Sequence, residues 1–236
     1  MKLYHDLTQC SFLYRVNRFI AKCLVNGTEI TVHVKNTGRL KELLRPGALC
    51  WLEKAGNPNR KTPYDLIAVE KNGRIVNIDS QAANLIAREW VENGGWIASI
   101  TRLQSEYTFG DSRYDMAYWT DASAGETNRR PGGLIEVKGV TLFDESGAAY
   151  FPDAPTARGT KHLRGLISAK QSGMETGVCF VILNEDAVCL IPNSRTDPDF
   201  SAALKEAHDA GVRIEAAICR VTPEGAEIVG TIPVRL

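Results

Sequence analysis

The chain has 236 residues, of which 44% are apolar and 24% charged, which excludes the polar, core-poor composition of a disordered protein. Its 28 Lys and Arg residues balance its 28 Asp and Glu residues, so no global basic charge draws the whole protein to a polyanion. Any nucleic-acid site is therefore local. The length exceeds a typical single domain of roughly 100–150 residues, and we expect two domains, 1–80 and 81–236.

The first 80 residues show short strand-like segments separated by turn residues. Pairs such as Asn26-Gly27, Pro46-Gly47 and Asn72-Gly73 are typical of tight turns between strands. This punctuation predicts a five-stranded OB-like barrel, although the order of strands alone does not separate it from an SH3-like barrel. The expected strands cover residues 12–22, 29–34, 48–54, 64–70 and 74–78.

The second half of the chain has an α/β pattern. Asp79-Ser80 is an N-cap signal before a helix at 81–92, in which Leu85, Ile86 and Trp90 recur at helical spacing. A polar loop is expected at 121–133, and Gly211 is a plausible C-cap for the last helix. Further strands are expected at 114–119, 134–142, 177–183, 187–191 and 212–220, and further helices at 160–171 and 199–210.

Cysteine usage and hydropathy indicate a reducing, aqueous compartment. The six cysteines form no CxxC pair and several lie in apolar runs, so we interpret them as reduced core residues and not as a disulfide frame or zinc site. Polar residues interrupt the first 20 positions, and no run approaches the roughly 18 apolar residues of a membrane span. We expect a cytoplasmic protein that does not bind a membrane.

The segment that indicates chemistry is Glu136-Val137-Lys138. Residues two apart on a strand share a face, so Glu136 and Lys138 emerge together, and pairing with the strand of Asp115 would bring a second carboxylate beside Glu136. Glu89, four residues after Leu85 on the preceding helix, is expected toward a partly apolar face as a third carboxylate. Carboxylates beside an ammonium suit Mg²⁺ or Mn²⁺ and phosphoryl chemistry. The alternatives are a cross-strand ion pair and a solvated helix glutamate.

Basic residues gather in two places. Residues 154–174 contain no acidic side chain, and cations at the start of a helix could join its N-terminus in holding phosphate. In the barrel half, basic loops with Trp51 and Tyr64 are candidates for strand binding and base stacking, while burial of Trp51 and a solvated basic face are the alternatives. The candidate nucleic-acid contacts are Lys35, Asn36, Arg39, Arg60, Lys61, Arg113, Arg158, Lys161 and His162.

A helix Glu, a strand Asp and a strand Glu-x-Lys resemble the PD-(D/E)xK nuclease superfamily. Longer strings resemble one family within it, the sugar fermentation stimulation protein A family. The resemblance implies an N-terminal OB-like domain, a C-terminal restriction-endonuclease-like α/β domain and DNA binding. The strings are Asn36-Thr37-Gly38-Arg39, Glu42-Leu43-Leu44 with Pro46-Gly47, Asn59-Arg60-Lys61-Thr62, Ser112-Arg113-Tyr114-Asp115, Glu136-Val137-Lys138-Gly139-Val140-Thr141-Leu142, and Phe151-Pro152-Asp153-Ala154 with Arg158-Gly159-Thr160-Lys161-His162-Leu163.

Two functions follow as hypotheses. The first is a Mg²⁺- or Mn²⁺-dependent nuclease, with Asp115 and Glu136 as metal ligands, Glu89 as an outer ligand or water anchor, and Lys138 as the group that stabilises charge or orients water. The second is a non-catalytic DNA-binding regulator of sugar (maltose-type) metabolism genes. Gathering three carboxylates near DNA would weaken a pure binder by repulsion, which favours the nuclease. A homodimer is compatible with the sequence, which does not fix the oligomeric state.

Overall fold

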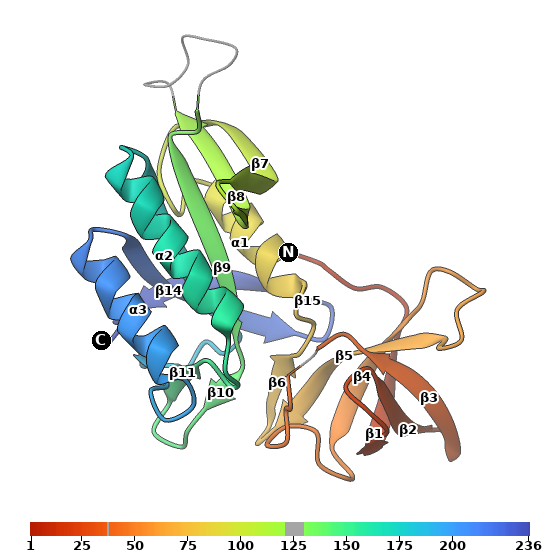
Figure 1. Cartoon of the computed structure of the whole chain (residues 1–236). Helices are drawn as coiled ribbons and strands as arrows, with labels where there is room; N and C mark the ends of the chain where they lie inside the picture. The colour runs from red at the N-terminus through yellow and green to blue at the C-terminus, as the bar shows by residue number, and fades with distance from the viewer. Residues whose placement is uncertain (37, 121–129) are drawn as a thin grey trace.

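The computed structural model describes residues 1–36, 38–120 and 130–236, which form a barrel domain and an α/β domain side by side (Figure 1). In the barrel, antiparallel pairing runs in the order β3-β2-β1-β4-β5-β6, and parallel pairing of β3 with β5 closes five of these strands. The predicted OB-like barrel is confirmed. Its strands are β1 (Leu7–Arg15), β2 (Ile20–Val25), β3 (Thr28–Val34), β4 (Leu49–Lys54), β5 (Tyr64–Lys71) and β6 (Arg74–Asn77).

The single strand expected at 12–22 is wrong, because the chain turns between β1 and β2. The Asn17 side chain causes this turn: its Oδ1 accepts hydrogen bonds from the backbone N–H groups of Phe19 at 2.8 Å and Ile20 at 3.0 Å. Short polar side chains commonly stabilise turns in this way. A β-hairpin that belongs to the barrel therefore lies where a continuous strand was predicted.

The barrel core explains the cysteines of the first domain. Cys10, Cys23 and Cys50 are buried among aliphatic side chains and Phe12. All six cysteines of the chain are buried and free, as predicted. Trp51 is also buried, packed with Tyr4 and Ile67, so its proposed role in base stacking is wrong and the burial alternative is correct.

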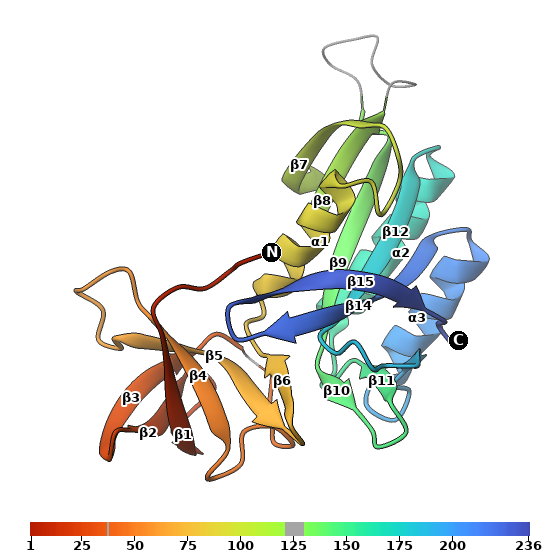
Figure 2. The same ribbon diagram turned by 180° about the vertical axis from the view of Figure 1, so that it is seen from behind.

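The second domain is a mixed sheet in the order β15-β14-β12-β9-β8-β7, covered by α1 on one face and by α2 and α3 on the other (Figures 1 and 2). The small sheet β10-β11-β13 lies at one end. The elements are α1 (Ala82–Glu92), β7 (Ile100–Phe109), β8 (Ser112–Thr120), β9 (Gly133–Val140), β10 (Leu142–Phe143), β11 (Ala148–Phe151), α2 (Ala157–Gln171), β12 (Glu175–Ile182), β13 (Cys189–Pro192), α3 (Pro198–Asp209), β14 (Arg213–Thr222) and β15 (Gly225–Ile232).

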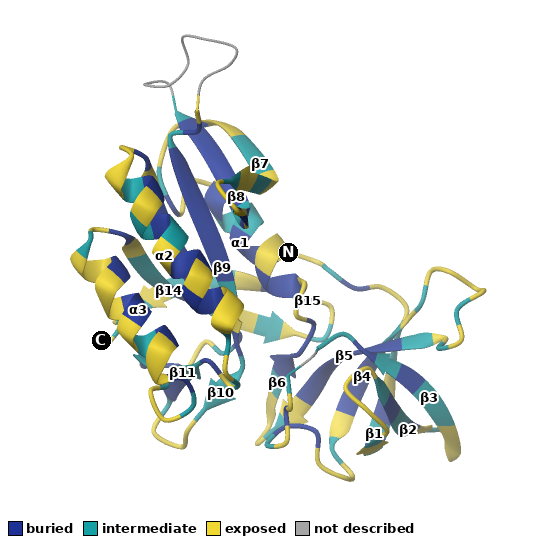
Figure 3. Cartoon of the chain, viewed as in Figure 1, coloured by how far each residue is buried: buried dark blue, intermediate teal, exposed yellow. Residues whose placement is uncertain are grey.

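Four strands of this domain were not predicted: β7, β10, β11 and β15. The two edge strands β7 and β15 are half exposed and lack the apolar runs of the central strands, and β10 and β11 are short. By contrast β9, where the Glu-x-Lys pair lies, is almost entirely buried between the helix layers (Figure 3). Residues 121–129 of the predicted polar loop 121–133 lie outside the described residues.

The helices begin and end at polar signals in the sequence. Asp79 Oδ1 accepts from the N–H of Gln81 at 2.9 Å, one residue before α1. Thr156 caps α2 through the N–H of Gly159, so this helix begins at 157 and not at 160. Asp197 caps α3, and Gly211, with φ of +83°, follows its end as predicted. None of the helices that the structure describes is long and apolar enough to cross a membrane.

Candidate active site

The site lies where β8 and β9 part. The two strands pair antiparallel only as far as Met116 opposite Ile135. At the next position a side chain takes the place of a main-chain acceptor. Oδ2 of Asp115 accepts a hydrogen bond from the backbone N–H of Val137 at 2.7 Å. A main-chain donor on the neighbouring strand therefore fixes this carboxylate beside Glu136.

Glu136 is a buried carboxylate with one satisfied and one unsatisfied oxygen. Its Oε1 accepts from the Lys138 ammonium and lies 2.5 Å from Nδ1 of His162. Its Oε2 is also buried and has no hydrogen-bond partner in the described structure. Burial alone would raise the pKa of Glu136, but the contacts with His162 and Lys138 hold it below its ordinary value. Glu136 is therefore an ionised carboxylate whose second oxygen is buried without a hydrogen-bond partner, which is costly for a polar atom.

The pKa of Asp115 is shifted in the opposite direction from that of Glu136. Its Oδ1 accepts from the Asn84 side-chain amide of α1 at 2.8 Å. Burial and the nearby charge of Glu136 raise the pKa of Asp115, in spite of the bond from Val137 and the attraction of Lys138. Two neighbouring carboxylates whose different surroundings shift their pKa values in opposite directions are typical of functional sites.

His162 supports Glu136 from α2. The ring is buried against Tyr114, and its Nε2 lies 3.4 Å from Nε of Arg158, which can only donate. Nε2 is then the acceptor, and the proton on Nδ1 points at Glu136. The structure therefore places His162 within the site as a partner of a carboxylate. Its predicted role as a direct nucleic-acid contact does not fit a ring that is 5% exposed with both nitrogens engaged.

Glu89 does not join this cluster. Its Oε2 lies 3.3 Å from the amino nitrogen of Met1, and within 1–36, 38–120 and 130–236 no three Asp, Glu, His or Cys side chains are placed to hold one metal ion. The predicted arrangement of three carboxylates is therefore absent from the described residues. The residue of α1 that reaches Asp115 is Asn84, five positions earlier and about 140° around the helix.

A cleft of about 910 Å³ separates the two domains next to this site. One wall is formed by the barrel, including Tyr14, Arg18 and Arg39, and the other by the α/β domain, including Ala83 and Gly139. The latter two adjoin Asn84 and Lys138 in sequence, so the cleft reaches α1 and β9, two elements that carry residues of the candidate site.

Comparison with known proteins identifies the family. Residues 13–78 match the model of the "SfsA N-terminal OB domain", and residues 81–225 match the "Sugar fermentation stimulation protein RE domain". The chain belongs to the sugar fermentation stimulation protein family. The resemblance inferred from the sequence strings is confirmed.

Relatives in this family align along nearly the whole chain. The sugar fermentation stimulation protein homologs of Desulfitobacterium hafniense strain DCB-2 and Clostridium tetani are 42% and 44% identical, covering 99% and 94% of this chain and 98% and 94% of theirs. A solved structure, SfsA of Pyrococcus furiosus in complex with Ca²⁺, is 27% identical with a TM-score of 0.87 and covers 100% of this chain and 98% of that one.

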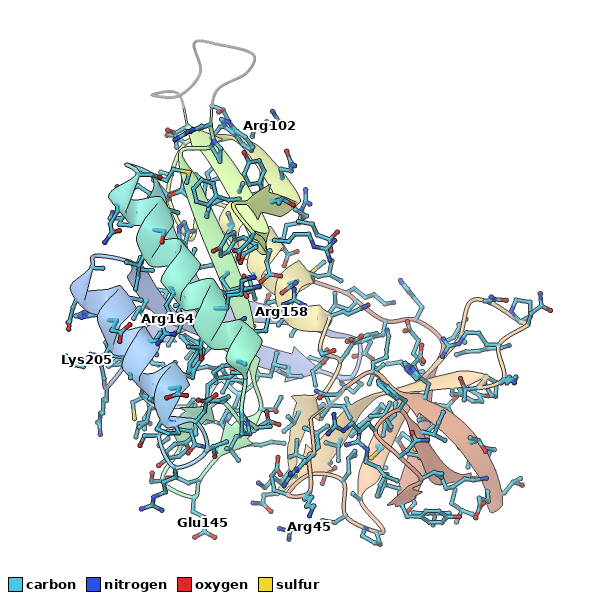
Figure 4. All side chains as sticks on the ribbon, viewed as in Figure 1. Arg45, Arg102, Glu145, Arg158, Arg164 and Lys205 are labelled. Carbon is cyan, nitrogen blue, oxygen red and sulfur yellow. The ribbon has the colours of Figure 1, made fainter. Side chains whose placement is uncertain are left out.

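In this family member the predicted nucleic-acid contacts divide into two groups. Lys35 pairs with Asp79 at 2.9 Å, the Asn36 amide bonds the carbonyl of Ile78, and Arg60 pairs with Asp65. These three hold the barrel together. The others are exposed: Lys61, Arg39 on the cleft wall, Arg113 and Lys161 in surface ion pairs with Glu106 and Asp111, and Arg158 at the end of α2 nearest the barrel (Figure 4).

Arg60→Ala is expected to destabilise the protein by about 1–3 kcal/mol, because it leaves the buried carboxylate of Asp65 with only His33. Although burial works against it, Arg60 and His33 lower the pKa of Asp65. The stability that these two contacts contribute is present above the pKa of Asp65 in the unfolded chain, and it is lost as pH falls through the lower pKa of Asp65 in the folded protein. Urea denaturation at pH 7 and below pH 4 measures both effects.

The matched control is Lys61→Ala, at an exposed position next along the chain. We expect this variant to lose less than about 0.5 kcal/mol of folding stability. Equal stability of the two variants at pH 7 would show that Arg60 is not structural.

Sequence reasoning missed Asn84 and the contact between His162 and Glu136. An asparagine on a helix carries no catalytic signal by itself, and its place depends on the rotational phase of α1. His162 was marked as part of a basic helix start, but its burial five residues into α2 follows only from packing of that helix on β8 and β9.

Proposed function

We propose that this protein is a divalent-metal-dependent nuclease that hydrolyses phosphodiester bonds of DNA. The observation that carries the proposal is the buried, unpartnered Oε2 of Glu136 beside Asp115 and Lys138. A native protein rarely leaves such an oxygen without a partner, and a bound cation would provide one.

The residues fit a hard cation. Asp115 and Glu136 would hold Mg²⁺ or Mn²⁺, since Mg²⁺ is commonly bound by one or two carboxylates, with water and substrate phosphate as the other ligands. The relative from Pyrococcus furiosus was solved in complex with Ca²⁺, which also takes oxygen ligands, and this supports the proposal. When bound, such an ion lowers the pKa of a water molecule and stabilises the charge on a phosphate.

The protein's own groups have separate tasks. Lys138 offers a positive charge next to Glu136 and would neutralise charge on the phosphate or orient the attacking water. His162, on α2, keeps Glu136 ionised and fixes its orientation through the contact with Oε1. Asn84 and the N–H of Val137 fix Asp115. Arg158, exposed at the start of α2, would hold a flanking phosphate.

The test is cleavage of labelled single- and double-stranded DNA with Mg²⁺, Mn²⁺ or chelator. We expect metal-dependent cutting by the wild type and none by Asp115→Ala. Asp209→Ala, an exposed aspartate of α3, is the matched control and should cut normally. DNA binding without cleavage under every condition would instead favour the regulatory alternative.

A further inference from the structure

The hairpin between β1 and β2 exposes apolar side chains at the edge of the interdomain cleft. Tyr14 and Phe19 are each 51% exposed and Val16 is 54% exposed. Single exposed apolar residues are ordinary, but three within six positions at one hairpin end, Tyr14 in β1 and Val16 and Phe19 in the turn, are an unusual concentration. Of the two aromatic rings, Tyr14 lines the cleft and Phe19 does not.

Arg15 fixes this hairpin to the loop that follows β3. Its guanidinium donates to the carbonyls of Gly38 at 2.7 Å and Asn36 at 2.9 Å, and also to the carbonyl of Arg18 within the hairpin. The cleft wall is thus a braced surface. Side chains on such a surface bind with little loss of conformational freedom.

The charge of the cleft is positive on the barrel side. Arg18, Arg39 and Lys41 are exposed on its wall. Two acidic residues also line it: Asp79 is neutralised by Lys35 at 2.9 Å, and the exposed Asp153 near Gly38 leaves one negative charge against the three cations. Three cations beside an aromatic ring are the combination with which OB barrels hold unpaired strands: phosphates meet the charges and bases stack on the ring.

The far end of the cleft lies beside α1 and β9, two elements that carry residues of the candidate active site. Ala83 and Gly139, on its opposite wall, are the neighbours of Asn84 and Lys138. A strand that enters beside Tyr14 and follows the cleft therefore comes to the end of β9, one residue beyond Lys138. The volume of about 910 Å³ is that of a pocket enclosing a small ligand, which accommodates a few unpaired nucleotides but not a duplex.

From this geometry we infer that the interdomain cleft binds a single-stranded segment of DNA, with a base stacked on Tyr14 and phosphates held by Arg18, Arg39 and Lys41. The inference rests on the proposal that nucleic acid is the substrate, and it names the unpaired strand as the form that is recognised. A duplex would bind only where its end or a junction frays into a single strand.

The experiment measures fluorescence anisotropy of a short labelled single-stranded DNA in chelator, so that no cleavage occurs. Tyr14→Ala should weaken binding on the order of tenfold, the loss of one base–aromatic stack. Phe19→Ala, equally exposed on the same hairpin but outside the cleft, is the matched control and should bind like the wild type. Lys41→Ala should weaken binding and reduce its salt dependence, whereas Lys205→Ala on α3 should change neither (Figure 4).

Three outcomes would overturn the inference: tighter binding of a blunt duplex than of the single strand, equal weakening by Tyr14→Ala and Phe19→Ala, or no effect of either. An RNA strand of the same sequence, if bound in preference, would replace DNA as the ligand. The nuclease proposal fails separately. If the wild type binds through Tyr14 but never cuts with Mg²⁺ or Mn²⁺, the cleft assignment holds and the catalytic one does not.

Discussion

Lys138→Ala is expected to lower the rate of DNA cleavage by about 100- to 1,000-fold while leaving single-strand binding in chelator unchanged. Removing one group that stabilises developing charge typically costs this much. Lys138 donates to Oε1 of Glu136 and is only 16% exposed, so its charge acts within the site and adds little to long-range attraction of DNA. Initial rates under saturating DNA and metal measure the effect.

The pH profile gives a second readout for the same variant. Lys138 helps to keep the pKa of Glu136 low, so its loss moves that pKa upward. The residual activity of Lys138→Ala should therefore begin to fall at a higher pH on acidification than the activity of the wild type. A lysine that held the fold without contacting Glu136 would not shift this limb.

The control is Lys170→Ala, which removes a lysine from the same domain that pairs with Glu175 at 2.6 Å on the surface. It should cut DNA at the wild-type rate. Full activity of Lys138→Ala, or an equal loss in both variants, would remove Lys138 from the chemistry.

The sequence predicted the strand residues of this site better than its helix residue. Strand alternation is rigid, so the shared face of Glu136 and Lys138 and the approach of Asp115 followed from a period of two and one strand pairing. The position of Glu89 on the helix was predicted from Leu85 and Ala82, but Leu85 is exposed, whereas Ala82, Ala83, Ile86, Ala87 and Val91 face the sheet. With the phase of the helix wrong, Glu89 was chosen in place of Asn84.

The barrel shows the same limit for basic residues. Its fold could be read from Gly, Asn and Pro at the turns, but the tasks of its cations could not. Lys35 and Arg60 precede the polar Asn36 and the basic Lys61 in sequence, and only the folded chain reveals that each neutralises a buried aspartate. The exposed Tyr14 was missed because 12–22 was expected to be one strand, which hides the hairpin.

Asp115→Asn is expected to raise the melting temperature of the metal-free protein at pH 7 by about 2–4 °C, the shift that about 1 kcal/mol gives in a chain of this size. Burial and the charge of Glu136 raise the pKa of Asp115, so the folded state disfavours its ionised form. The asparagine carbonyl can still accept from Val137, and a flipped Asn84 amide can accept from the new NH₂ group.

The sign of the pH dependence follows from the raised pKa. The pKa of Asp115 is higher in the folded protein than in the unfolded chain, where it is ordinarily 3.8. The stability that depends on the protonated side chain is therefore fully present below the unfolded pKa and is lost as pH rises through the folded pKa. The advantage of Asp115→Asn should therefore be large at pH 7 and vanish near pH 4. Asp209→Asn tests the assignment, because His208 and Lys205 lower the pKa of that exposed carboxyl and no gain is expected.

Added Mg²⁺ or Mn²⁺ should reverse the order of the two proteins. A cation held by Asp115 and Glu136 relieves their repulsion and stabilises the wild type by about 2.7 kcal/mol at a concentration 100 times its dissociation constant. Asp115→Asn lacks one ligand and keeps its melting temperature when metal is added. Since thermal denaturation with chelator and with metal needs no DNA, it tests the carboxylate pair independently of cleavage. A variant that is less stable than the wild type in chelator, yet gains as much from metal, would show that Asp115 neither repels Glu136 nor shares a cation with it.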